Sequence, residues 1–324
     1  MTTSVGRACG KVILLGEHAV VFGIPAIAVG IDRGASAAAG DAASPSRLVV
    51  PEWELDLAED DEHELARAFR ALLAATGRPG SVRVEARADL PPGGGLGCSA
   101  ALGVAIARAL DPAADAALTA SRAMAWERIF HGNPSGVDAA VAAGGGCVLF
   151  QKGEGERPSL IDPIHARGGL SLVIGHTGLA SSTKLMVEAV ARLRERRPDI
   201  VKKTFEGIYV LVKNARLAIE ARDHFALGRL MDLNQMLLSG LFLSTPEIEQ
   251  LCDLARTAGA HGAKLTGAGG GGSVVALVPG AAAGARVLEA WEKAGFSGFT
   301  THVAESDTGS LAAAHLEAVE AAET

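Results

Sequence analysis

The apolar positions of the chain follow two periods, and the first half predicts strands that alternate with helices. KVILL (11–15) and PAIAVGI (25–31) are short apolar runs typical of buried strands, and SVRVEARADL (81–90) alternates as a half-buried strand does. Apolar residues three and four apart in HELARAFRALLAATG predict a helix that ends at Gly77. The other elements expected here are a helix from Ser99, a helix over 117–130 and a strand over 146–150.

The second half is predicted to be richer in helices. Helical periodicity covers 182–195, 202–222, 225–239, 246–258 and 283–294, and strands are expected at 170–175, 273–278 and 299–304. The alanine-rich end, 311–324, predicts a frayed helix. Segment 151–169 is polar and contains two prolines, so we expect a connection there, between domains of residues 1–167 and 168–324.

Composition narrows the class of protein. A hydrophobic fraction of 48% with 21% charged residues is typical of a compact globular chain. The net charge of -7 argues against a nucleic-acid partner, which requires a concentrated basic face. The first apolar run spans five residues, too short for a signal peptide or a membrane span, so we expect a cytoplasmic protein without a membrane partner. The four cysteines show no CxxC spacing, which favours reduced thiols over a zinc or disulfide framework.

The segment LPPGGGLGCSAA (90–101) joins a predicted strand to a predicted helix through a glycine-rich turn. Glycines let backbone N–H groups surround an anion, and the positive end of a following helix dipole favours the same guest, such as a di- or triphosphate. The same glycines also fit a tight turn with no ligand. Neither the G-x-x-x-x-G-K-[ST] nor the G-x-G-x-x-G phosphate motif is present in its required context.

Two further segments place charged residues where strands and helices end. Lys11 opens an apolar strand, and Glu17 and His18 follow the glycine at its end. Glu127 lies late in a predicted helix, and Asp138 follows a Pro-Ser-Gly turn, so both carboxylates can converge on one site. Taken singly, the lysine also fits a solvated surface position, the carboxylates fit caps or exposed charges, and the histidine fits a turn-stabilising role.

Together these segments resemble the GHMP kinase superfamily. The resemblance is carried by GKVILLGEHAVVFGIPAIA (10–28), LPPGGGLGCSAALGVA (90–105), HGNPSGVD (131–138) and KLTGAGGGGSVVAL (264–277), in the family's order and spacing. It implies an α+β fold of two domains: an N-terminal one like domain 2 of ribosomal protein S5, with a left-handed crossover, and a ferredoxin-like C-terminal one. ATP is expected to bind between them.

The match is strongest to the members that phosphorylate the 5-hydroxyl of mevalonate, in isoprenoid biosynthesis. The resemblance implies that Asp138 is the catalytic base and that Lys11 stabilises charge beside it. It assigns Mg²⁺ to Ser99 and Glu127, which supply the oxygen ligands that this ion prefers. It assigns ATP binding to Pro92, Gly93, Gly94, Gly95, Leu96, Gly97, Cys98, Ser99 and Ala100, and acceptor binding to Glu17, His18, Thr183 and Ala268. Relatives are often homodimers.

Some positions depart from the family, and other functions stay open. Where most relatives carry two serines this chain has Cys98-Ser99, and a helix N-terminus at Cys98 predicts a thiol of lowered pKa. Other acceptors in the superfamily are phosphomevalonate, mevalonate at its 3-hydroxyl, and sugars. A nucleotide-binding regulator without catalysis is the alternative from a different class.

Overall fold

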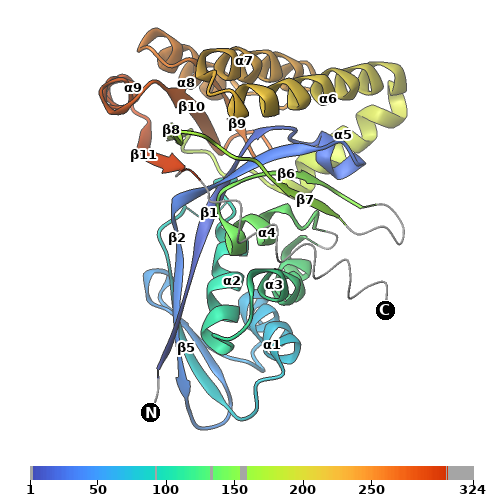
Figure 1. Cartoon of the computed structure of the whole chain (residues 1–324). Coiled ribbons are helices and arrows are strands. Elements are labelled where there is room, and N and C mark those ends of the chain that lie inside the picture. The colour runs from blue at the N-terminus through green and yellow to red at the C-terminus, as the bar shows by residue number, and fades with distance from the viewer. Residues whose placement is uncertain (1–2, 92, 132–133, 154–158, 304, 306–324) are drawn as a thin grey trace.

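The computed structural model describes residues 3–91, 93–131, 134–153, 159–303 and 305. They form two sheets, each with its own set of helices (Figure 1). The predicted C-terminal helix over 311–324 lies outside the described residues. Within the described part of the chain, no helix combines the length and the hydrophobicity needed to cross a bilayer.

The first sheet has seven strands in the order β4-β3-β5-β2-β6-β7, with β1 paired to β2. All neighbours are antiparallel except β3 and β5, which are parallel and lie on either side of α1 in the sequence. The strands are β1 (Ser4–Leu15), β2 (Ala26–Asp41), β3 (Arg47–Val50), β4 (Leu55–Ala58), β5 (Val82–Ala88), β6 (Cys147–Gln151) and β7 (Leu160–Pro163). Short 3₁₀ helices occupy Ala19–Phe22 and Pro51–Trp53.

Four helices gather on one face of this sheet (Figure 1). They are α1 (Glu64–Thr76), α2 (Cys98–Leu110), α3 (Ala116–His131) and α4 (Val137–Gly144). Helix α2 is built almost entirely of small aliphatic residues and is buried along nearly its whole length between the sheet and α3. Small side chains let α2 lie close to β1, so its N-terminus reaches the strand that carries Lys11.

The second sheet has four antiparallel strands in the order β11-β8-β10-β9. Its strands are β8 (Leu170–His176), β9 (Gly262–Thr266), β10 (Ser273–Val278) and β11 (Ser297–Val303). The order places the last and first strands of this domain side by side and its second strand at the edge, which is the ferredoxin-like topology that the family resemblance implied. The helices are α5 (Thr183–Arg196), α6 (Pro198–Glu220), α7 (His224–Gly240), α8 (Pro246–Thr257) and α9 (Ala281–Lys293).

Local sequence signals located most elements, but strands β3, β4, β7 and β9 and helix α4 were missed. Gly77 ends α1 in a left-handed conformation, as predicted. The stretch after the Pro-Ser-Gly turn, expected to lead directly to a strand, first forms α4, since VDAAVAAG is rich in helix-forming alanine. The predicted connection over 151–169 contains β7, which pairs with β6. Strand β9 was missed because it has only five residues and runs directly into the glycine loop.

The two sheets meet along the β1–β2 pair (Figure 1). Thr266 of β9 accepts a hydrogen bond from the Ile13 backbone N–H at 2.9 Å and donates one to the Ile13 carbonyl at 3.2 Å. On β2, the Asp32 backbone N–H donates to Thr301 of β11, and the Arg33 guanidinium lies 4.0 Å from the centre of the Phe299 ring. Strand β1 therefore belongs to the first sheet and also forms part of the surface on which the second rests.

Candidate active site

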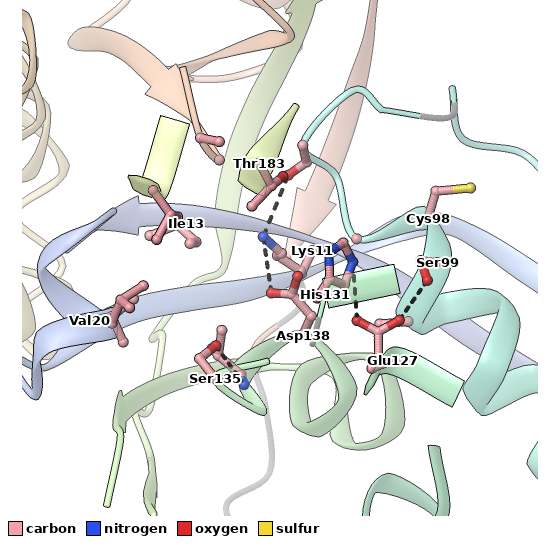
Figure 2. A pocket seen from close by; sticks show the side chains of 18 of the residues that line it. Lys11, Ile13, Val20, Cys98, Ser99, Glu127, His131, Ser135, Asp138 and Thr183 are labelled. Carbon is pink, nitrogen blue, oxygen red and sulfur yellow. Dashed lines mark hydrogen bonds and ion pairs between the residues drawn. The ribbon is translucent and has the colours of Figure 1, made fainter. Parts of the chain in front are cut away.

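A cleft opens where β1, the α2 N-terminus, α4 and the C-terminal glycine loop converge (Figure 2). Each of the four sequence motifs contributes to its wall. The lining residues that carry polar or backbone chemistry are Lys11, His18, Gly93, Gly94, Gly95, Gly97, Cys98, Ser99, Ala100, Glu127, His131, Ser135, Asp138, Thr183, Gly267 and Ala268. Segments more than 250 positions apart thus share one cavity.

Lys11 and Asp138 form an ion pair in this cleft. The Lys11 ammonium lies 3.1 Å from Asp138 Oδ1, and the lysine side chain is buried while the aspartate is 32% exposed. Asp138 lies in the first turn of α4, where the positive end of the helix dipole favours a carboxylate. Gly136 allows the entry to that helix because its φ of 91° is readily adopted only by glycine. A carboxylate accessible from the cleft and backed by a cation is suited to accept a proton from a bound alcohol.

Ser99 and Glu127 form the second polar group. Ser99 Oγ donates to Glu127 Oε1 at 2.6 Å, and the Trp126 indole N–H donates to the Ser99 carbonyl at 3.0 Å, which fixes α2 against α3. Burial raises the pKa of Glu127 to about 7, the Ser99 hydrogen bond opposes this change, and the nearby Asp138 charge adds to it. His131 lies 3.7 Å from the other oxygen of Glu127. Figure 2 shows these side chains directed toward the same space as Lys11.

The glycine segment before α2 presents its backbone to the cleft. Gly93, Gly95 and Gly97 all have positive φ values, between 71° and 75°. A Cβ on Gly95 would lie 2.9 Å from the Thr266 carbonyl of the second sheet, so only glycine allows this close approach. The loop is held on its other side by a hydrogen bond from the Lys11 backbone N–H to the Leu96 carbonyl, at 2.9 Å. The first residues of α2, Cys98, Ser99 and Ala100, also line the cleft, and a helix N-terminus favours an anion.

The C-terminal glycine loop closes the cleft from the second sheet. The loop folds tightly on the segment before α5 and on the loop after α7: the Gly270 N–H donates to the Leu243 carbonyl at 2.7 Å. A Cβ on Gly269 would lie 2.3 Å from that same carbonyl. At the cleft edge, His18 Nε2 lies 2.8 Å from the Ala268 carbonyl. The glycines of this loop therefore permit close packing between segments of backbone.

Most of the predicted site residues meet in the cleft, but some do not line it. Glu17 is fully buried, pairs with Lys264 and is not among the residues that line the cleft. The Leu96 side chain packs in the core, and only its backbone is near the site. Pro92 lies outside the described residues. The expected low pKa of Cys98 is wrong, because burial and then the Glu127 charge raise it to about 11.

Sequence reasoning also overlooked residues that the cleft contains. His131 is the first residue of HGNPSGVD and faces both Glu127 and the cleft, yet only the aspartate of that motif was assigned. Ile13, Val20 and Val21 supply an apolar wall beside His18. Their apolar pattern predicted a strand and gave no signal that one face of it is open to a ligand.

Comparison with known families defines the class of protein. Residues 63–146 match the family model described as the GHMP kinases N terminal domain, and residues 215–297 match that of the GHMP kinases C terminal. Both halves of the fold and the glycine-lined cleft agree with these matches. The protein is a GHMP kinase, and kinases of this family use ATP.

Individual relatives narrow the class further. The chain is 35% identical to a mevalonate kinase of Pyrococcus abyssi over 304 residues, covering 85% of this chain and 89% of that protein. It is 35% identical to a mevalonate kinase of Aeropyrum pernix, covering 92% and 95%. The crystal structure of the L. major mevalonate kinase in complex with R-mevalonate superposes with a TM-score of 0.82 at 29% identity, covering 94% and 97%. The chain belongs to the mevalonate kinase family.

Proposed function

We propose that the protein transfers the terminal phosphate of ATP to the 5-hydroxyl of mevalonate, forming 5-phosphomevalonate. The observation that carries the proposal is the Lys11–Asp138 pair at 3.1 Å, in a cleft that is also lined by the glycine segment at the N-terminus of α2. Membership in the mevalonate kinase family supports the choice of acceptor. A cytoplasmic location and a homodimer stay predictions.

Asp138 is assigned the proton-accepting role. As the hydroxyl oxygen attacks phosphorus it becomes more acidic, and a carboxylate within hydrogen-bond reach takes its proton. The Lys11 ammonium contacts this carboxylate, and it also lies 3.5 Å from the Gly95 carbonyl in the phosphate-binding segment. It is therefore placed to stabilise negative charge on both the attacking oxygen and the transferred group.

The cradle residues are assigned to the polyphosphate and its metal ion. Ser99 Oγ and the Glu127 carboxylate lie 2.6 Å apart, and both are oxygen ligands that suit Mg²⁺. The described residues contain no cluster of three His, Cys, Asp or Glu side chains, so phosphate oxygens and water would complete the shell. Mg²⁺, when bound, neutralises charge on the phosphates. Glu127, whose pKa is about 7 without the ion, would then be held as a carboxylate.

The acceptor is assigned to the side of the cleft near His18 and Thr183. The Ala268 carbonyl only accepts hydrogen bonds, so His18 Nε2 must carry the proton that it shares with that carbonyl. Burial lowers the pKa of His18, which keeps the ring neutral, and Nδ1 is therefore an acceptor. This nitrogen is buried without a hydrogen-bond partner among the described residues. An unpaired acceptor suits a substrate hydroxyl better than a carboxylate.

A screen of acceptors tests the proposal. ADP release is measured by a coupled assay with ATP, Mg²⁺ and, in turn, mevalonate, phosphomevalonate and a set of sugars, and the product is identified by NMR. We expect turnover with mevalonate and phosphate on its C5 oxygen. Good turnover of phosphomevalonate with none of mevalonate would refute the assignment, as would phosphate on the C3 oxygen.

A further inference from the structure

A fully buried ion pair joins the two sheets beside the cleft. The Lys264 ammonium contacts Glu17 Oε1, and the Asn234 side-chain amide donates to Glu17 Oε2 at 3.1 Å. All three side chains are buried, and they come from the turn after β1, from β9 and from α7. Burial raises the pKa of Glu17 and lowers the pKa of Lys264, and the attraction between the two opposes both changes.

This pair is poorly explained as a source of stability alone. Removing two charges from water costs several kcal/mol per ion, and apolar side chains of similar volume often hold a core as well or better. Apolar packing is available nearby, because β9 and α7 also bury aliphatic residues such as Leu265, Met231 and Leu238 beside the polar Gln235 and Thr266. An ion pair adds geometric specificity, because two particular charged groups must lie within hydrogen-bond distance of each other.

This geometric specificity matters because the turn that contains Glu17 continues into a strained residue, His18. His18 has φ 59° and ψ -47°, a backbone conformation that residues other than glycine rarely adopt and that costs about 1–3 kcal/mol. Such strain persists only where surrounding contacts hold it. One contact is the hydrogen bond from His18 to the Ala268 carbonyl, and the preceding residue, Glu17, is fixed by Lys264 and Asn234.

Three contacts join residues 264–268 to the first sheet. Lys264 and Thr266 are alternate residues of β9, so their side chains share a face, and they bind Glu17 and Ile13. Ala268 lies in the glycine loop, two residues after β9 ends, and its backbone carbonyl binds His18. Lys11 lies two residues before Ile13 on the same strand.

We propose that Glu17, Lys264 and Asn234 are positioning residues that hold the strained turn at His18 against the second sheet, and so determine how tightly the acceptor binds. Among the described residues, no hydrogen bond or ion pair joins them to the phosphate cradle or to the Lys11–Asp138 pair, and the charges of Glu17 and Lys264 act on Lys11 with opposite sign. Their loss should therefore weaken acceptor binding far more than ATP binding. The inference rests on the proposed function only in taking mevalonate as the acceptor.

The test compares Lys264→Met, Glu17→Gln and the double variant with the wild-type enzyme. We expect each single variant to raise KM for mevalonate by about tenfold, the effect of losing one charge-assisted hydrogen bond, with KM for ATP changed by less than about twofold. The double variant leaves no unpaired buried charge, so its unfolding temperature should recover toward the wild-type value. The KM of the double variant for mevalonate should stay raised, because the ion pair between Lys264 and Glu17 is still absent.

Arg256→Met is the matched control. Arg256 joins α8 to α7 through Asp232 at 3.0 Å, and it donates to the Ala263 carbonyl of β9, so it supports the same helix and strand from the side away from the cleft. We expect it to lower the unfolding temperature without changing KM for mevalonate. If the single variants of the ion pair fail to fold, Asn234→Ala removes one hydrogen bond to Glu17 and should raise the same KM by about threefold or more.

The outcomes separate this inference from the proposed function. Recovery of KM for mevalonate together with stability in the double variant would overturn the positioning role, and so would equal rises in KM for ATP and mevalonate. If the wild-type enzyme does not phosphorylate mevalonate and phosphorylates another alcohol, the proposed function is wrong. The KM comparison is then made with that alcohol, and the positioning role is judged on its result.

Discussion

Asp138→Asn removes the proposed proton acceptor while keeping the shape of the side chain. Because a positioned general base contributes about 100- to 10,000-fold, we expect kcat to fall by that factor, which corresponds to about 3–5 kcal/mol in the activation barrier. ATP binding should be nearly unchanged, since the cradle is formed by other residues.

The structure predicts a much smaller change in folding stability. At 3.1 Å from Lys11, and with an effective dielectric constant of about 20, the gross attraction is about 5 kcal/mol. The Asp138 side chain is 32% exposed, so water screens this attraction, and the net contribution is expected to be about 1 kcal/mol. The unfolding temperature should therefore fall by only a few degrees.

The assay is coupled ADP release at saturating mevalonate and ATP, with unfolding followed by calorimetry. Asp111→Asn is the matched control, because Asp111 has nearly the same side-chain exposure, 33%, and pairs with Arg122 at 2.6 Å, away from the cleft. It should leave kcat unchanged. Retention of kcat within about tenfold of the wild-type value by Asp138→Asn would show that Asp138 is not the general base.

Three further predictions concern the cradle, the metal ion and the acceptor side. Gly95→Ala and Gly77→Ala both force alanine into a left-handed conformation, at about 1–2 kcal/mol, but only Gly95 has a carbonyl 2.9 Å from the new Cβ, and nothing lies within 4 Å at Gly77. Calorimetry should show that both variants are less stable than the wild-type protein. Only Gly95→Ala should lower kcat/KM. Ser99→Ala and Glu127→Gln should each raise the Mg²⁺ concentration for half-maximal rate by about tenfold or more, and an unchanged Mg²⁺ titration would contradict the metal assignment. Because burial lowers the pKa of His18 below 6.5, the ring stays neutral as the pH falls from 8 to 6.5 and gains a proton only in more acidic solution. KM for mevalonate should therefore be flat over that range and rise below it, whereas His18→Asn should lack the rise.

Signals within short segments located most elements of the fold. The helix at 64–76 followed from its apolar spacing and from Gly77, which ends it in a left-handed conformation. The strand at 82–88 followed from strict alternation. Strand β7 was missed because its four residues lie in a polar, proline-containing segment and are stabilised mainly by pairing with β6, which no local pattern records.

The features of the site likewise fall into those that short segments indicate and those that depend on tertiary packing. The glycine turns, the serine at the start of α2 and the Pro-Ser-Gly turn before Asp138 are local devices whose residue types fit a phosphate site as well as a turn without a ligand, and the resemblance to GHMP kinases assigned them to ATP, Mg²⁺ and the catalytic base. The burial of Glu17 away from the cleft has a tertiary cause. Its partner, Lys264, lies 247 positions away, and only the packing of β9 against the turn after β1 brings the two together.

By itself, then, the sequence determined where the backbone turns and which chemical groups stand at those turns, because φ preferences, capping and periodicity act over a few residues. The resemblance to a known family implied that Lys11 lies beside Asp138, whereas only the tertiary structure decided that the Cys98 thiol is buried and that Glu17 pairs with Lys264. Burial and charge pairing depend on which distant segments come to share a low-dielectric space, and that is a property of the folded arrangement as a whole.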